Sequence, residues 1–543
     1  MDSNNNNGFL RIWKNKVLRN MIRQHNLLGQ KIKITPAYAI KNLNHFKTIS
    51  CDLLNIILYI DNDNVDDYET LKKKGFIHKG LHIDIAKKHI LTNDLIYKTV
   101  KRVKFSSKFN SDLPAGFFPN TVERIYFNDM YLCPIKKGVL PAGLLEVRFG
   151  DSYNSSLNGI LPSKLETLIL GQYYRLPLTM PQSLTHLEIG LRFGGRIEPM
   201  PPKLRVLKSR SMDGECLSML GKSTNIHAGN VGFNLQVLDL ESARVLCDDY
   251  RWLPRGLVKL KLPKGFNSVI HPDEFPDSLV SLSLGQVFNT RIEPGCLPNA
   301  LQTLKLGHYY GHSLKGVLPM TLTKLHLSLS FDHGNTLWKY KHLKILGIYS
   351  INQFPLGHVI PKTIQKLVLD GPIDVAKGQI PANVQVLKII KPNSIQDGAI
   401  PPSVRVLELL AQPMETSAVT IPKGIRKLTF APMFLRAQDI PDTVQHLTIL
   451  SKCDYELGSI PVSVKTLILH HNPNNSEYGL ISPNVKRLIM VKEGLYSSNF
   501  IDPLSLPKDI SFDAHFGYYQ ARLSFPEFKT IKKDGVLMTN KLK

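Results

Sequence analysis

The sequence has few cysteines and no long apolar run. Six cysteines are spread over 543 residues without a CxxC pair, which argues against a disulfide framework and against a zinc site. The longest strongly apolar stretch is the segment 53–60, far shorter than the roughly 20 residues that span a bilayer. The first residues are polar and lack the apolar region of a secretory signal. We therefore expect a cytoplasmic protein that is neither secreted nor transmembrane.

Motifs of the common enzyme classes are also absent. The chain contains no GxSxG elbow, no HExxH zinc motif and no GxGxxG nucleotide loop, and no short segment unites a nucleophile, a base and an oxyanion donor. We therefore expect no enzymatic activity, no catalytic residues, no metal site and no cofactor.

Acidic residues are scarce relative to basic ones. Lys and Arg number 68 against 44 Asp and Glu, which gives a formal net charge of +24. Such a balance favours acidic partners through long-range attraction. The charge is spread along the whole chain, so we expect an acidic protein partner and keep nucleic acid as an alternative.

What the sequence does contain is an internal repeat. A proline is followed by aliphatic residues three, six and eight positions later, as in Pro298 with Leu301, Leu304 and Leu306. The pattern predicts about 18–20 repeats of 19–22 residues. Counting from the proline, positions six and eight differ by two, so both side chains point to one face of a short strand. Proline cannot donate to a strand ladder and therefore precedes the strand.

A single repeat cannot bury its own aliphatic row, whereas a stack of repeats can. The spacing leaves little room for helices, so turns and short extended pieces should fill the outer side. The sequence therefore predicts a leucine-rich-repeat-like solenoid of stacked short parallel β-strands over residues 75–515, with few helices except an N-terminal helical cap.

The segment from Phe288 to Pro298, followed by Leu301 to Gly307, resembles the FNIP repeat. This is a degenerate relative of the leucine-rich repeat, found mainly in social amoebae and some giant viruses. Partial matches begin at Tyr153 and Phe266. The resemblance implies a binding scaffold and brings no catalytic residues with it.

The ends of the chain lack the repeat. Residues 1–74 begin with an amphipathic pattern over 9–23 that predicts a helix, with Trp13 on its apolar face. We interpret this segment as a helical cap. Two alternatives are an F-box-like module over 9–60, which some FNIP relatives carry, and a basic helix on an anionic membrane. The acidic stretch 61–69 is expected to be a solvated loop, and residues 516–543 a frayed tail or a cap.

The register also predicts which side chains leave the core. Positions five, seven and nine should lie on the concave strand face, which carries a basic patch and, further along, exposed aliphatic residues. The partner-binding candidates are Lys259, Lys261, Lys305, Lys324, His326, Val386, Ile390, Val406 and Leu410.

The function that we expect is a non-enzymatic scaffold that binds a protein through this face. The alternatives are substrate recognition in a ubiquitin ligase, with the N-terminal segment docking an adaptor, and nucleic-acid binding by the basic face.

Overall fold

The computed structural model divides the chain into two compact units. Unit 1 comprises Met1–Phe266 with Asp273–Leu279, and unit 2 comprises Asn267–Pro272 with Val280–Lys543. The structure describes residues 31–34, 36–41, 43, 55–76, 78, 80–85, 91–107, 109–193, 201–210, 234–243, 250–251, 253–328, 337–350, 354–355, 360–410, 419–436, 438–451, 454–455, 458–470, 484–492, 511–516, 531–533 and 536–538. The predicted helix over 9–23 lies outside these residues.

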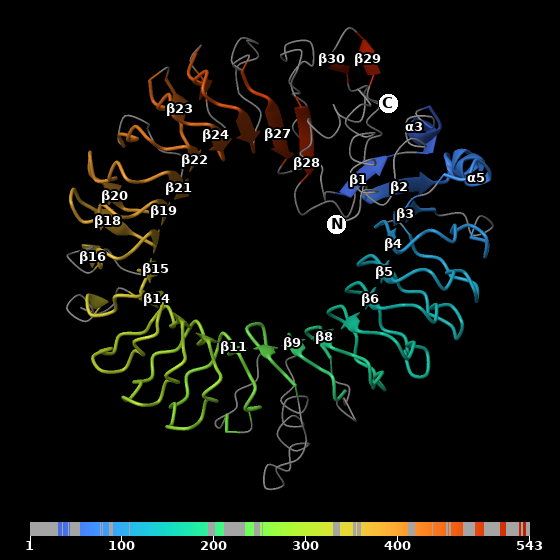
Figure 1. Ribbon diagram of the computed structural model, residues 1–543, viewed down its shortest axis with the longest axis horizontal. Helices are drawn as coiled ribbons and strands as arrows, with labels where there is room; N and C mark the ends of the chain where they lie inside the picture. The colour runs from blue at the N-terminus through green and yellow to red at the C-terminus, as the bar shows by residue number, and fades with distance from the viewer. Residues whose placement is uncertain are drawn as a thin grey trace, which may run out of the picture. The chain divides into compact units, whose positions relative to one another are not determined.

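Unit 1 is built from eleven described strands and two described helices (Figure 1). In chain order they are β1 (Lys31–Ile34), α3 (Pro36–Lys41), β2 (Asn55–Asp61), α5 (Val65–Lys73), β3 (Gly80–Asp84), β4 (Arg102–Phe105), β5 (Arg124–Tyr126), β6 (Glu146–Arg148), β7 (Thr167–Ile169), β8 (His186–Ile189), β9 (Val206–Ser209), β10 (Val237–Asp239) and β11 (Lys259–Lys261).

Unit 2 continues the pattern with one principal strand per repeat. These strands are β12 (Ser281–Ser283), β13 (Thr303–Lys305), β14 (Lys324–Ser328), β15 (Ile345–Tyr349), β17 (Lys366–Asp370), β19 (Val386–Ile390), β21 (Val406–Leu410), β22 (Lys427–Phe430), β24 (His446–Ile449), β26 (Thr466–Leu469), β27 (Arg487–Lys492) and β28 (Ser511–Phe516). Shorter strands lie on the outer side: β16 (Phe354–Pro355), β18 (Ile373–Val375), β20 (Ser394–Ile395), β23 (Phe434–Leu435) and β25 (Asp454–Tyr455).

Each principal strand pairs in parallel with its neighbour so that equal repeat positions face each other. Leu304 pairs with Leu325, Leu325 with Leu346, and Leu346 with Leu367. These leucines, at position six, are fully buried. The predicted solenoid of parallel strands is confirmed, because this register lets each repeat cover the aliphatic row of the one before.

The segment 55–73 differs from what its composition suggested. β2 pairs in parallel with β1 and β3, so strands as well as helices occupy the region assigned to the N-terminal cap. The expectation of a solvated loop over 61–69 was wrong, because α5 begins at Val65. Its residues Tyr68 and Leu71 are buried. The Asp61 carboxylate accepts hydrogen bonds from the backbone N–H groups of Asp63 and Asn64, which closes the turn before the helix.

Buried aromatic rings stack from repeat to repeat in unit 1. The ring centroids of Tyr131 and Tyr153 lie 6.2 Å apart, those of Tyr153 and Tyr174 lie 6.4 Å apart, and those of Tyr174 and Phe193 lie 6.2 Å apart. Their interplanar angles are 4–12°. Each ring therefore covers the face of the ring in the next repeat, which extends the core beyond the aliphatic rows.

Asparagines next to these aromatic positions connect successive repeats. The Asn154 Oδ1 accepts a hydrogen bond of 2.9 Å from the Arg175 N–H in unit 1. The Asn289 Oδ1 accepts one of 2.9 Å from the Gly311 N–H in unit 2. The aromatic–asparagine pair of the repeat thus has a structural reason, since the ring fills the core and the amide satisfies a backbone group of the following turn.

The described part of the C-terminal region contains further strands. β28 pairs in parallel with β27. β29 (Ile531–Lys533) and β30 (Val536–Met538) form an antiparallel pair within the segment predicted as a frayed tail or a cap.

Candidate partner-binding surface

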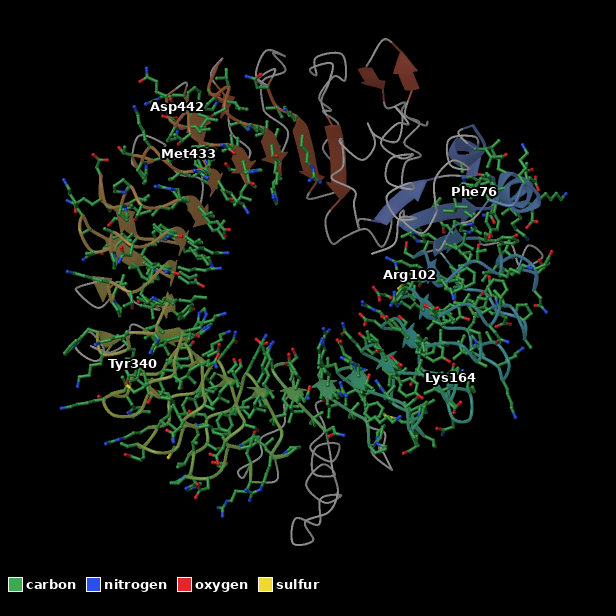
Figure 2. All side chains as sticks on the ribbon, viewed as in Figure 1. Phe76, Arg102, Lys164, Tyr340, Met433 and Asp442 are labelled. Carbon is green, nitrogen blue, oxygen red and sulfur yellow. The ribbon has the colours of Figure 1, made fainter. Side chains whose placement is uncertain are left out.

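The alternation of each strand separates the core from an open side, which we call the strand face. In β13, Leu304 is buried and Thr303 and Lys305 are partly exposed. The same pattern holds in β17, where Leu367 and Leu369 are buried between more exposed residues. Figure 2 shows side chains on the inner side of each unit, among them Arg102 of β4. The predicted assignment of positions five and seven to the strand face is therefore confirmed in these strands.

The nine predicted partner-binding residues fall into three groups. Lys259 and Lys261 lie on β11 of unit 1. Lys305, Lys324 and His326 lie on the adjacent strands β13 and β14 of unit 2. Val386, Ile390, Val406 and Leu410 lie on the adjacent strands β19 and β21, also of unit 2.

Within unit 1 the charge of Lys261 is already neutralised. Its Nζ lies 2.9 Å from the Asp239 carboxylate and 3.0 Å from the Glu241 carboxylate. Partial burial opposes the charged form, but the hydrogen bonds to the two carboxylates raise the pKa of Lys261 above its ordinary value. Lys259 is exposed. Lys261 is thus held by its own unit, and of the two lysines Lys259 is the one open to a partner.

In unit 2, three lysines on nearby strands act on the charge of one histidine. Lys305, Lys324 and Lys366, together with His326, are called here the lysine cluster. Burial of the imidazole, followed by repulsion from Lys324, Lys305 and Lys366, lowers the pKa of His326 to about 4. The sequence grouped the first two lysines with His326, but it did not add Lys366, which comes from β17, two strands away from β14.

A glycine makes room for this histidine. Gly347 pairs with His326 across β14 and β15. A Cβ at Gly347 would lie 2.0 Å from the His326 Nδ1, far inside van der Waals contact. The imidazole therefore occupies the space of the missing side chain and lies against the β15 backbone.

A second histidine borders the lysine cluster. The ring of His308 stacks on the ring of Tyr349, with centroids 3.8 Å apart. Burial and then the charge of Lys305 lower the pKa of His308, while Asp370 opposes that shift. The charge of Lys305 thus lowers the pKa of both histidines, whereas the Asp370 carboxylate raises the pKa of His308.

Further along the same unit, the strand face is apolar around an ion pair. Val386 pairs with Val406 and Ile390 with Leu410 in the register of β19 and β21, and all four side chains are partly exposed. Between the two apolar pairs, the Lys388 Nζ lies 3.2 Å from the Glu408 carboxylate. We call the four aliphatic side chains the aliphatic strip.

The described part of the chain holds no group of three or more His, Cys, Asp or Glu side chains that could bind a metal ion. None of its helices has the length and apolarity to cross a membrane.

Comparison with known proteins identifies the repeat. The family model of the FNIP repeat matches residues 109–152, 131–173, 153–192, 266–309 and 288–330. No curated protein matches the sequence. Among solved structures, the circular leucine-rich-repeat protein CroV588 is similar, with 19% identity, a TM-score of 0.45, and 86% of this chain and 75% of that chain covered. YopM, a leucine-rich effector protein from Yersinia pestis, is similar with 15% identity, a TM-score of 0.25, and 78% of this chain and 90% of that chain covered. The chain therefore contains FNIP repeats, which the family model matches over residues 109–192 and 266–330.

Proposed function

We propose that this protein is a non-enzymatic scaffold that binds a protein partner, preferably an acidic one, through the strand face. The aliphatic strip carries the proposal. Its four side chains point away from the core and remain partly exposed on two adjacent strands. Apolar side chains gathered on an otherwise polar face are typical of a contact surface. The lysine cluster of the same unit supplies the preference for an acidic partner.

The charge pattern of the strand face favours protein over nucleic acid. Three lysines at position seven are paired with acids on the neighbouring strand: Lys208 with Glu188, Lys261 with Asp239, and Lys388 with Glu408. A surface that binds phosphates along a nucleic-acid backbone needs unpaired cations along its whole length. Alternating charges with apolar residues between them suit a protein surface better.

The proposal is tested by changing the aliphatic strip without touching the core. Val386→Ser and Leu410→Ser remove apolar contact area, and Val462→Ser is the matched control because Val462 is 68% exposed in the same unit. Full-length protein is purified from the native cell, and its bound proteins are identified by mass spectrometry. We expect the unchanged protein and the control to retain the same partner, and the two strip variants to lose most of it.

Other results would point elsewhere. Equal recovery of the partner by all variants would rule out the strip as the contact surface. Nucleic acid that nuclease removes from the complex, together with loss of binding at high salt, would favour the basic-face alternative. A ubiquitin-ligase adaptor that is lost in Trp13→Ala would favour the alternative in which the N-terminal segment docks an adaptor.

A further inference from the structure

The lysine cluster differs from three other lysines on the strand face, each of which has an acid beside it. At position seven, Lys208 has Glu188 at 3.7 Å, Lys261 has Asp239 at 2.9 Å, and Lys388 has Glu408 at 3.2 Å, each on the adjacent strand. The strand neighbours of Lys305 at the same position are Ser283 and His326.

No described acidic side chain forms an ion pair with Lys305, Lys324 or Lys366. The carboxylate of Asp370 raises the pKa of His308, and it is not among the groups that change the pKa of His326. Three ammonium charges therefore face one imidazole with no described carboxylate to balance them.

The backbone beneath the cluster fixes its geometry. Because Gly347 has no side chain, the His326 ring lies against β15. Lys324 and Lys366 lie one step back along the same face, on β14 and β17, with Ile345 of β15 between them in the register. Adjacent strands are about 4.8 Å apart, so Lys324 and Lys366 begin roughly 10 Å apart on either side of β15. Lysine side chains are long enough for their ammonium groups to converge across this separation on one small group above the His326 ring.

We propose that the lysine cluster binds a phosphoryl group carried by a protein partner. The inference rests on the proposed function, since it names the chemistry that one part of the strand face recognises in that partner. A phosphate monoester carries a charge of about −1.5 to −2 and three strong acceptor oxygens. A carboxylate carries one charge and would leave most of the cationic charge unbalanced. Lysine binds phosphate as a point charge, and the partly exposed imidazole adds a ring N–H.

The first experiment uses inorganic phosphate as the probe and the histidine Cε1–H resonances of the full-length protein as the readout. His326→Asn identifies the His326 resonance. We expect that resonance to move with phosphate along a saturable curve, and acetate to leave it in place at the same concentration. Lys305→Gln and Lys366→Gln should each weaken phosphate binding by roughly tenfold, because each removes a charge-assisted hydrogen bond. Lys315→Gln, which removes an exposed lysine from a turn outside the strands of the same unit, should bind as the unchanged protein does.

A second probe separates protein-borne phosphate from free phosphate. N-acetyl phosphoserine amide should displace inorganic phosphate from the cluster. If it does not, the group recognised is a free anion and the proposal fails. Acetate that binds as tightly as phosphate, or a Lys315→Gln variant that loses as much affinity as Lys305→Gln, would also overturn it.

This experiment needs no protein partner, so its failure is distinct from that of the proposed function. Loss of the partner in the aliphatic-strip variants without phosphate binding at the cluster would leave the scaffold proposal intact and reject only the phosphoryl site.

Discussion

A column of glycines in unit 1 should tolerate no side chain, and this can be tested at one position. A Cβ at Gly171 would lie 2.0 Å from the carbonyl oxygen of Gly150 and 2.5 Å from the Cα of Asp151. Ordinary van der Waals contact begins at 3.4 Å. The atoms in the way belong to the backbone of the preceding repeat, so no change of side-chain rotamer relieves the clash. The repeats must instead move apart by more than 1 Å, as the difference between these distances requires.

The expected cost of Gly171→Ala follows from that movement. Overpacking typically costs about 1–3 kcal/mol. Separating the repeats also weakens bonds between them, such as that from the Tyr173 N–H to the Asp151 carbonyl at 3.0 Å, each worth about 0.5–1.5 kcal/mol. We therefore expect Gly171→Ala to lower the free energy of unfolding by about 3 kcal/mol.

Gly256 in the same unit provides the matched control. A Cβ there would meet nothing within 4 Å, and its φ is not in the left-handed region. Gly256→Ala should raise stability by about 0.4–1 kcal/mol, because alanine restricts the unfolded chain. Urea unfolding followed by circular dichroism compares the two variants with the unchanged protein. A midpoint for Gly171→Ala equal to or above that of Gly256→Ala would refute the reasoning.

Three further predictions concern single contacts. Asn289→Ala removes the hydrogen bond to the Gly311 N–H and should cost about 1 kcal/mol in urea unfolding; an unchanged midpoint would mean that water replaces the amide. Burial lowers the pKa of His78 to about 4, so between about pH 6.5 and pH 4 the unfolded chain binds a proton that the folded chain does not, and stability should fall through that window as the pH is lowered. The unfolding midpoint of His78→Phe, measured at pH 7 and pH 4.5, should show a smaller decrease than that of the unchanged protein, and an equal decrease would contradict the assignment. Gly347→Ala places a methyl group against His326 and should weaken phosphate binding at the lysine cluster, with the His326 resonance displaced before any ligand is added; an unmoved resonance would show that the ring does not rest on this glycine.

The sequence by itself determined the repeat, its register and the aliphatic core. Proline followed by aliphatic residues at positions three, six and eight places one strand in each repeat. The period of two along that strand decides which side chains are buried. Leu304, Leu325 and Leu346 lie where that pattern puts them. The reason is that these features depend on spacing within about 20 residues, which the chain repeats many times.

The local pattern was less informative where several signals competed. Residues 61–69 are rich in Asp and Asn, which are typical of turns, yet α5 forms because Tyr68 and Leu71 bury one face of it. The segments that begin at Phe288, Phe266 and Tyr153 were matched to the FNIP repeat from the sequence. The role of the aromatic residue and the asparagine that follows it depends on stacking and hydrogen bonding between residues about 20 positions apart. Such contacts exist only once the repeats are stacked.

Only the tertiary structure decided which basic residues are available to a partner. Lys261 and Lys305 occupy the same repeat position, yet one has carboxylates at 2.9 and 3.0 Å and the other has His326 and Ser283 as strand neighbours. Charge balance on a parallel sheet is set by residues one repeat away on adjacent strands. Sequence spacing fixes the face on which a lysine lies, and the neighbouring repeats fix whether its charge is already neutralised.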